Sequence, residues 1–280
     1  MTIQDWKTVD ISNNFMFRFV MEKKELCQGL LERVLDIKIR RIEYLSPEKN
    51  LEAVLGAKGV RLDVYIEDDQ GTAYDLEMQA LDKKGDPLGK RSRYYQSMMD
   101  IDALKKSQLY SNLRKSYVIF ICKFDPFERD LGRYSFSNIC REDKKLELED
   151  ECYKVYLNTV GKKDGLSKEL QALMDFINTG IPQDEYTRKL YEEVKIQRDD
   201  ERKGRAYMTY EQEMLEREEK GRKKGLQEGR KEGREEERVA NIKTFVKTMR
   251  ELNIEKDIVL AKLKENYQLT ETEAQAYLKE

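Results

Sequence analysis

The sequence predicts an α/β fold with a mixed sheet, followed by a long charged helix and a small helical tail. Three observations support this fold class: alternating apolar and polar residues around a turn at 62–79 (LDVYIEDDQGTAYDLEMQ), an apolar run at 117–124 (YVIFICKF), and a change to mostly Glu, Lys and Arg at 195–238. Alternation is typical of a strand with one buried face, and a short apolar run is typical of a strand buried on both faces.

The first helix is expected to begin at Ser12 and Asn13, which can cap it, and apolar residues at helical spacing extend it to Leu31. Residues 36–45 (DIKIRRIEYL) alternate and predict a strand, which ends in a loop around Ser46-Pro47. The hairpin at 62–79 then supplies two further strands.

A second helix is predicted within residues 90–113, ahead of the apolar strand at 117–124. Its length suits a crossover connection, so this fourth strand is expected to lie parallel to one strand of the hairpin. The core order is therefore αβββαβ. Two further strands are predicted at 133–139 and 152–160, and a helix at 166–178.

Residues 1–180 are assigned to this domain, and residues 183–238 to a charged helical linker with glycines at every fourth position from 221 to 233. Each glycine weakens a helix by about 1 kcal/mol relative to alanine. The linker is therefore either a solvated, partly frayed helix or a helix that packs closely against an identical copy. Residues 239–280 are expected to form a small helical unit, whose apolar stripe from Val239 to Leu252 is the best candidate for a homodimer contact.

Composition excludes several kinds of chemistry. The 280 residues include no histidine, which excludes Ser-His-Asp and Cys-His catalysis and imidazole metal ligands. Charged residues make up 39%, against about 25% in typical soluble proteins, yet the net charge is only −2. Catalysis would therefore depend on carboxylates, Lys, Tyr, Cys or a metal with oxygen ligands, and any nucleic-acid site must be local.

Targeting signals and disulfide patterns are absent from the sequence. No apolar run approaches the ~18 residues of a membrane span, and the N-terminus lacks the apolar core of a signal peptide. We expect no membrane contact and a cytoplasmic location. The four cysteines show no CxxC spacing and are expected to be buried, reduced thiols: Cys27, Cys122, Cys140 and Cys152.

The hairpin is expected to place two carboxylates side by side. A three-residue loop at 69–71, with Gly71 at the positive-φ position, pairs Asp63 with Glu77 and leaves Gln79 on the same polar face. Opposed Cβ atoms are about 4.5–5.5 Å apart, and like charges there destabilise the pairing. Either a divalent cation offsets this repulsion, or the face is solvated and Arg61 or a lysine acts as counter-ion.

A basic stretch follows the hairpin. Residues 81–115 contain nine Lys or Arg and four Asp or Glu. Such a run either contacts phosphates or simply solvates a helix. Lys90, Arg91 and Arg93 are the candidate phosphate contacts, Tyr95 is a candidate for stacking on a base, and Tyr94 is expected in the core.

These segments together resemble the recombination-promoting nucleases of the PD-(D/E)XK superfamily, which are related to transposases. The resemblance covers essentially the whole chain. It rests on the charged glycine-repeat tail and four segments: NNFMFRFVMEKKELCQGLLERVL (13–35), IEYLSPE (42–48), VRLDVYIEDDQGTAYDLEMQ (60–79) and KRSRYYQSMM (90–99). It implies a restriction-endonuclease-like fold and metal-dependent cleavage of DNA, in recombination or in mobile elements.

The resemblance also implies roles for single residues. Asp63, Glu77 and the main-chain carbonyl of Met78 would bind Mg²⁺ or Mn²⁺. Gln79, at a position where the superfamily usually has Lys, would orient the attacking water or the scissile phosphate. The family usually has Asn-Asp before the first Phe where this chain has Asn13-Asn14, which would lower activity if that Asp binds metal or water.

The first helix could supply an additional acidic ligand, and the sequence does not distinguish among three candidates: Glu22, Glu25 and Glu32. Two other functions remain alternatives to the endonuclease. One is a nuclease-fold protein that binds DNA without cutting it, and the other is an assembly protein whose tail sets its oligomeric state.

Overall fold

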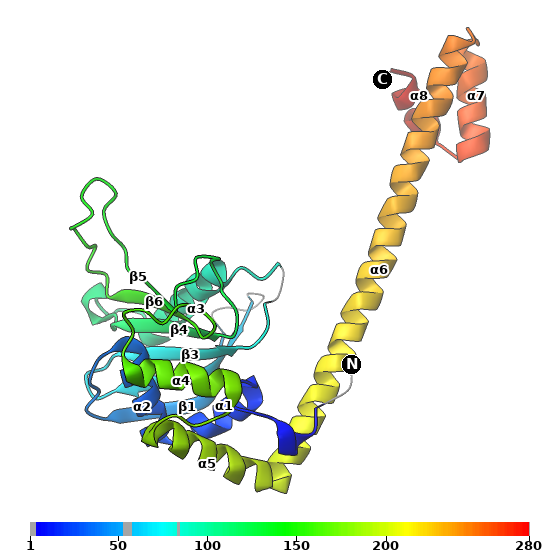
Figure 1. Ribbon diagram of the computed structural model, residues 1–280. Helices are drawn as coiled ribbons and strands as arrows, with labels where there is room; N and C mark the ends of the chain where they lie inside the picture. The colour runs from blue at the N-terminus through cyan, green and yellow to red at the C-terminus, as the bar shows by residue number, and fades with distance from the viewer. Residues whose placement is uncertain (1–3, 53–57, 83–84, 280) are drawn as a thin grey trace. The chain divides into compact units, whose positions relative to one another are not determined.

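The computed structural model describes residues 4–52, 58–82 and 85–279. The chain forms two compact units, of which the first extends to Met208 and the second covers Thr209–Glu280 (Figure 1). The predicted division into residues 1–180, 183–238 and 239–280 stays a prediction. Each unit is described by itself below.

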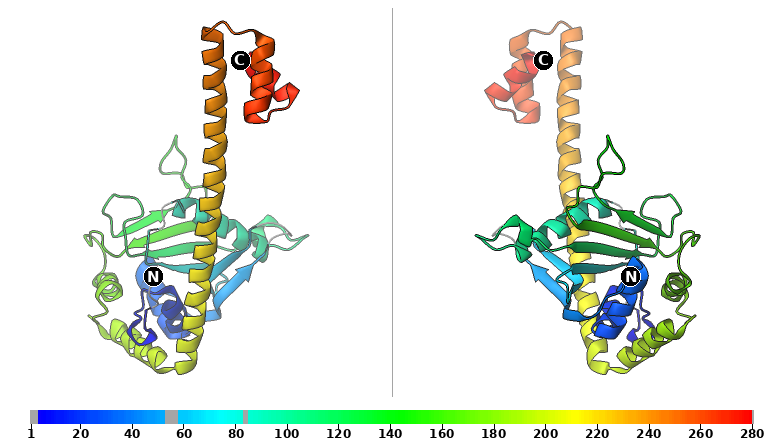
Figure 2. Two further views of the ribbon diagram at one scale, coloured as in Figure 1. Left: turned by 90° about the vertical axis from the view of Figure 1, so that its right-hand side faces the viewer. Right: turned by 90° about the vertical axis from the view of Figure 1, so that its left-hand side faces the viewer.

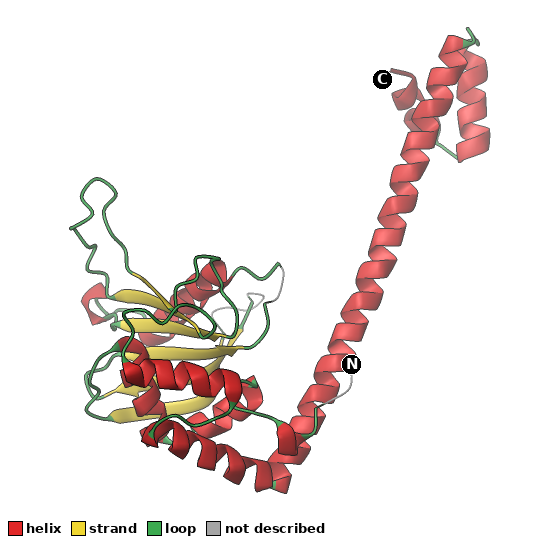
Figure 3. Ribbon diagram, in the orientation of Figure 1, coloured by secondary structure: helices red, strands yellow, loops and turns green. Residues whose placement is uncertain are grey.

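The first unit is built on a mixed sheet of six strands in the order β1-β2-β3-β4-β6-β5 (Figure 3). Strand β4 lies parallel to β3 and to β6, and all other neighbours are antiparallel. The predicted crossover between the hairpin and the apolar strand is therefore confirmed. The strands are β1 (Ile42–Leu51), β2 (Val60–Asp68), β3 (Ala73–Gln79), β4 (Ser116–Cys122), β5 (Arg133–Phe136) and β6 (Cys152–Asn158).

Helices cover both faces of this sheet. Helix α3 packs on β1, β2 and β4 from one side, and α1 packs on β1, β2 and β3 from the other (Figure 2). Helix α2 packs against α1, α4 and α5 on the α1 side. The predicted α/β class with a mixed sheet is confirmed. The helices are α1 (Asn14–Met21), α2 (Lys24–Leu35), α3 (Leu88–Ala103), α4 (Lys168–Thr179) and α5 (Glu185–Asp199), preceded by the short 3₁₀ turn η1 (Trp6–Thr8).

The first predicted helix is in fact two. Its start is confirmed, because the Asn13 side chain accepts hydrogen bonds from the N–H groups of Phe15 and Met16. The chain then leaves the helical conformation at Lys23, which is extended, before α2 begins. The apolar spacing continues through this break because α1 and α2 both bury their apolar faces, and both pack on β1 and α5.

The first strand lies further along the chain than predicted. Strand β1 begins at Ile42 and contains Pro47, which the sequence placed in a loop. Proline lacks an N–H and is tolerated in a sheet mainly on edge strands. Since β1 is the edge of this sheet, Pro47 fits within it opposite Val64.

Helix α3 is shorter than the predicted 90–113, because it ends at Ala103. The second half of the basic stretch, which includes Lys105, Lys106, Arg114 and Lys115, therefore lies in the connection to β4. That connection contains only the 3₁₀ turn η2 (Tyr110–Asn112).

The first unit continues past residue 180. Helix α5 packs on α1, and the Tyr186 hydroxyl donates a hydrogen bond of 2.6 Å to the Leu26 carbonyl. Tyr207 is buried, with its ring centroid 5.2 Å from that of Trp6. A part of the predicted linker is therefore packed within the first unit.

The long helix α6 (Glu201–Glu251) is continuous across the glycine repeat. A Cβ atom added at Gly221, Gly225, Gly229 or Gly233 would meet nothing within 4 Å. The ridge is therefore open to solvent along the described chain.

The end of α6 packs with α7 (Lys256–Tyr267) and α8 (Glu271–Lys279) around a small apolar core that includes Ile242, Val246 and Leu263. Thr270 and Glu273 form a capping box at the start of α8, since each side chain accepts a hydrogen bond from the other residue's N–H. The long charged helix and the helical tail are thus confirmed.

No cysteine takes part in a disulfide among the residues described. Cys27 and Cys122 are buried as predicted, and burial raises the pKa of each thiol to about 12. Cys140 and Cys152 are only partly buried, contrary to the prediction. Within the described ranges, no helix is long and apolar enough to cross a membrane, and the cytoplasmic location stays a prediction.

Candidate active site

The register of the β2–β3 hairpin agrees with the prediction. Val64 pairs with Leu76 and Glu67 with Ala73, so the strands are joined by a loop at 69–71 in which Gly71 has φ 82°. The Asp68 carboxylate fixes this loop by accepting hydrogen bonds of 2.9 Å from the N–H groups of Gln70 and Thr72.

The ladder between the two strands ends at Val64 and Leu76, and side chains take over the main-chain hydrogen bonds beyond that point. The Glu77 carboxylate accepts a 2.9 Å hydrogen bond from the Asp63 N–H, and the Asp63 carboxylate accepts one from the Met78 N–H. The structure therefore brings together the two carboxylates that the sequence placed opposite each other.

The face that carries these carboxylates is buried, although its sequence is polar. Helix α3 covers it, so that Asp63 is 8% exposed, Gln79 7% and Glu77 1%. An ordinary solvated strand face, one of the two alternatives drawn from the sequence, is therefore excluded.

Arg91 of α3 is the counter-ion of this buried face. Its guanidinium donates to the Glu77 carboxylate (2.8 Å) and to the Gln79 side-chain oxygen (3.0 Å), and its Nε donates to the Tyr95 hydroxyl (2.9 Å). The sequence favoured Arg61 or a lysine for this position and assigned Arg91 to DNA. Sequence spacing could not reveal the contact, because 14 residues separate Glu77 from Arg91 and only the packing of α3 brings them together.

Burial dominates the electrostatics of the site. It raises the pKa of Glu77 to about 8, an effect that the Asp63 charge reinforces and Arg91 opposes. Burial also raises the pKa of Asp63 to about 6, against the opposing charges of Arg18 and Arg91. Both carboxyl groups therefore bind protons more readily than usual in the folded chain, and an added cation would stabilise their ionised forms.

A third carboxylate, Asp75, completes the site, although the sequence analysis gave it no role. It is fully buried, and neither of its oxygens has a hydrogen-bond donor among the described residues. Burial and the neighbouring charges of Glu77 and Asp63 raise its pKa well above the usual range. The i, i+2 spacing to Glu77 on one strand face was the signal that could have identified it.

The proposed extra ligand from the first helix does not lie at this site. Glu22 pairs with Lys203 (3.5 Å), Glu32 accepts a hydrogen bond from the Ile39 N–H (3.0 Å), and Glu25 is exposed. The additional carboxylate comes from β3 instead.

The four predicted DNA contacts separate in the structure. The Arg91 side chain points from α3 toward the sheet and binds Glu77, whereas Lys90 is exposed. Tyr95 stacks on Phe120 in the core, with ring centroids 6.2 Å apart. Tyr94, expected in the core, is instead partly exposed and donates to the Lys58 carbonyl (2.6 Å).

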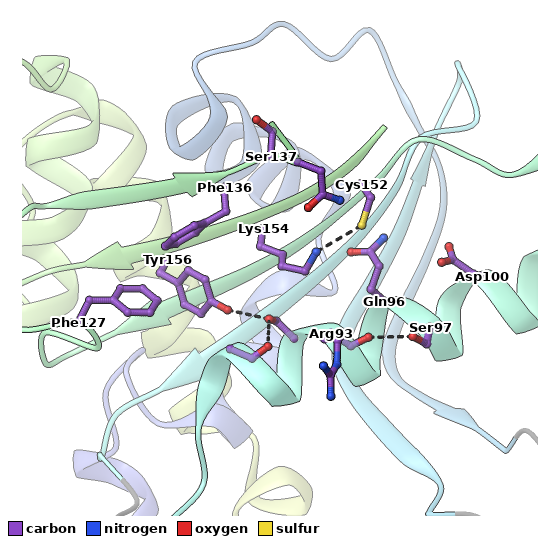
Figure 4. Close-up of a pocket in the computed structure, with 13 residues that line it drawn as sticks. Arg93, Gln96, Ser97, Asp100, Phe127, Phe136, Ser137, Cys152, Lys154 and Tyr156 are labelled. Carbon is purple, nitrogen blue, oxygen red and sulfur yellow. Dashed lines mark hydrogen bonds between the residues drawn. The ribbon is translucent and has the colours of Figure 1, made fainter. Parts of the chain in front are cut away.

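Arg93 lines a different cavity of about 550 Å³ between α3 and strands β5 and β6. Figure 4 shows Gln96 of α3 directed toward Cys152 and Lys154 of β6, and the Arg93 guanidinium turned away from these strands. The Tyr156 hydroxyl closes one end of the cavity by a 2.7 Å hydrogen bond to Ser92. Arg91 and Arg93, two residues apart, thus serve different surfaces.

The donor groups at the carboxylates suit a hard divalent cation, which prefers oxygen ligands. Since the Met78 N–H points to Asp63, its carbonyl faces the same edge of β3, where the ladder to β2 has ended. In the present arrangement, no three acidic or cysteine side chains of the described residues converge as they would around an ion. Both Glu77 oxygens are engaged, one by Arg91, so a cation at Glu77 requires that Arg91 turn away.

Comparisons with known proteins give a match at the level of the family. No curated protein and no solved structure matches the chain. A family model described as PD-(D/E)XK nuclease family transposase matches residues 12–227, which include the whole sheet, α3 and the first half of α6. The hairpin with its buried Asp63 and Glu77 lies inside this match, and the chain belongs to the PD-(D/E)XK nuclease family transposases.

Proposed function

We propose that the protein is a metal-dependent endonuclease that hydrolyses phosphodiester bonds of DNA, in recombination or in the movement of mobile elements. One observation carries the proposal: Asp63 and Glu77 are buried side by side where β2 and β3 part, with pKa values raised toward neutrality. Burying two carboxylates together is costly unless a cation joins them, so the arrangement is typical of a functional site rather than of a stabilising one.

Asp63, Glu77 and the Met78 carbonyl would hold Mg²⁺ or Mn²⁺. A bound divalent cation would supply an activated water and would neutralise charge on the phosphoryl oxygens. Burial and the charges of Glu77 and Asp63 raise the pKa of Asp75, which favours its neutral form and would leave Asp63 and Glu77 as the two anionic ligands.

Arg91 would supply the positive charge that a lysine provides at position 79 in most of the superfamily. Gln79 is neutral, but its side-chain oxygen holds the Arg91 guanidinium while its Nε2 donates to the Leu81 carbonyl (2.8 Å). We therefore assign Gln79 to the positioning of Arg91, and Tyr95, which accepts from Arg91 Nε, to the same task. Once released from Glu77, the guanidinium can bind the scissile phosphate and stabilise the charge that develops on it.

Lys90 and Arg93 remain the proposed contacts to flanking phosphates. Lys90 is exposed on the first turn of α3, and Arg93 has no ion pair with any residue in the described ranges. Each contact would add about 0.9 to the slope of log K against log salt on duplex DNA.

A plasmid-nicking assay tests the function. Wild-type protein with Mg²⁺ or Mn²⁺ should convert supercoiled DNA to the nicked form, and EDTA should stop the reaction. A parallel Mn²⁺ titration should raise the Tm of wild type but not of Asp63→Asn. Binding of DNA without nicking under any metal condition would favour the alternative of a non-cutting DNA-binding protein.

We propose in addition a homodimer through the C-terminal unit, because two sites are needed to cut both strands. Much of the apolar stripe from Val239 to Leu252 packs inside the C-terminal unit, where Ile242 and Val246 are buried. The exposed Leu252, Ile254 and Ile258 are what remains for a partner chain. Light scattering of the full chain and of a chain ending at Met208 tests this, since equal subunit numbers would exclude a role of the tail in assembly.

A further inference from the structure

Glu48 of β1 lies in one row with the two carboxylates of the site. The β1–β2 register pairs Pro47 with Val64 and Lys49 with Leu62, which places Glu48 opposite Asp63. The β2–β3 hairpin places Glu77 on the other side of Asp63. Three neighbouring strands thus each contribute one carboxylate at the same level of the sheet.

The backbone at Glu48 is unusual. Its φ is 90°, in the region that favours glycine, although it lies in the middle of a strand. A long side chain in such a conformation is strained and persists where the surrounding structure holds it. Contacts of the Glu48 side chain must therefore hold this backbone conformation.

Two arginines hold the Glu48 carboxylate. Arg18 of α1 binds one oxygen, and Arg61 of β2 lies 3.7 Å from the other. The Arg18 side chain is 7% exposed, whereas Glu48 and Arg61 are 37% and 39% exposed. Both guanidinium charges also act on Asp63, whose pKa they lower against the effect of burial. One buried and one partly exposed arginine therefore lie beside a proposed metal ligand.

We propose that Arg18 and Arg61 form a binding site for a backbone phosphate of DNA, and that the Glu48 carboxylate occupies this site when DNA is absent. The inference rests on the proposed function, since it places the phosphate next to Asp63. A phosphodiester resembles a carboxylate in presenting one negative charge shared by two oxygens, and guanidinium groups bind both with the same geometry.

The charge balance supports exchange of the two anions. Arg18 is buried and needs an anionic partner at all times, because an unpaired buried charge is strongly destabilising. Glu48 supplies that partner in free protein, and its exposure allows it to move into solvent when a phosphate arrives. Arg91 makes the corresponding exchange on the other side of Asp63, where it must leave Glu77.

The test measures how tightly the protein binds a short labelled DNA duplex, by fluorescence anisotropy over a range of salt concentrations. EDTA is present throughout, so that no cleavage occurs. Glu48→Gln removes the competing anion and should tighten binding by about fivefold, the range of one partly exposed ion pair. Glu43→Gln is the matched control, because Glu43 lies on the same strand and pairs with Arg41 away from the site. Its affinity should equal that of wild type.

Arg61→Gln provides a second, independent measurement if Glu48→Gln fails to fold. It should weaken binding and lower the salt slope by about 0.9, the loss of one phosphate contact. Unchanged or weaker binding by folded Glu48→Gln, or an unchanged slope for Arg61→Gln, would overturn the inference. The outcome is separate from the proposed function, because nicking by wild type with Mg²⁺ is scored in a different assay.

Discussion

Two ion pairs of nearly equal length behave differently in this protein. Glu77 and Arg91 lie 2.8 Å apart beneath α3, and Glu219 and Lys223 lie 2.7 Å apart on α6. The Glu77 side chain is 2% exposed, whereas those of Glu219 and Lys223 are 56% and 70% exposed. The pairs thus have nearly the same length but very different burial.

Burial changes what an ion pair does. On α6, water screens both charges, and an exposed i, i+4 pair contributes about 0.3–0.5 kcal/mol. Beneath α3, removing one partner leaves an uncompensated charge in the interior, which is strongly destabilising. We therefore expect the carboxylates under α3 to respond more strongly to pH, cations and mutation than those on α6.

The largest expected effect comes from the buried carboxylates. Asp63→Ala and Glu77→Ala should each lower the nicking rate by at least about 10³, since each removes a proposed metal ligand. Asp102→Ala is the control, because the Asp102 side chain is 45% exposed, pairs with Lys49 and is not among the proposed metal ligands, so the rate should be unchanged. Wild-type rates for either carboxylate variant would show that the buried pair is not the active site.

Arg91 gives the next effect. Arg91→Ala should lower the rate by about 10²–10³, the usual loss when one transition-state contact is removed. Gln79→Lys in the same chain should recover part of the rate, because it returns a cation to a position adjoining Glu77. Arg93→Ala serves as the control, since Arg93 lines the other cavity and should alter salt dependence rather than the rate at saturating DNA. Absence of recovery in the double variant would argue against charge supply by Arg91.

The dependence of stability on pH distinguishes the buried pair without any activity assay. Because the folded-state pKa of Glu77 is raised to about 8 from an ordinary value of 4.5, folded chains bind more protons than unfolded chains between these values. The metal-free protein should therefore lose stability as the pH rises through this window. Asp63, raised to about 6, adds to the loss between about pH 4 and 6.

Thermal unfolding at pH 5 and pH 8.5 checks this expectation. The Tm of Glu77→Gln minus that of wild type should become more positive at the higher pH, because glutamine does not titrate. Addition of Mg²⁺ at pH 8.5 should stabilise wild type and leave Glu77→Gln unaffected. A difference in Tm that is constant between the two pH values would contradict the raised pKa.

Substitutions on α6 should change the stability of the helix only slightly, and whether they stabilise or destabilise it shows whether the glycine ridge is solvated. Gly225→Ala should stabilise the helix by about 1 kcal/mol, since an added Cβ meets nothing within 4 Å. Circular dichroism of the full chain during heating would measure it. Destabilisation by the same change would indicate that the glycine ridge packs against a second copy of the chain, the other alternative drawn from the sequence.

The smallest expected effect is that of Lys223→Ala, which removes the exposed pair with Glu219. The helix should lose no more than about 0.5 kcal/mol. A loss of several kcal/mol, seen in the same melting curves, would mean that this pair is buried by a partner chain in solution.

Sequence alone determined the hairpin and the long helix. Strand alternation has a period of two, and a short loop with Gly71 fixes the register, so the pairing of Asp63 with Glu77 followed from local rules. The crossover to β4 followed from the length of the intervening segment. These features depend on residues that are close in the chain.

Tertiary structure decided what covers each element. The polar face of the hairpin gives no sign that α3 buries it, and no spacing rule connects Arg91 to Glu77 or Arg18 to Glu48. In the sequence, Pro47 predicted a loop, since proline is rare inside strands. Only the completed sheet shows that β1 is an edge strand, where a missing N–H is tolerated. Contacts between distant segments depend on how whole faces pack, and that packing set the burial from which the chemistry of the carboxylates follows.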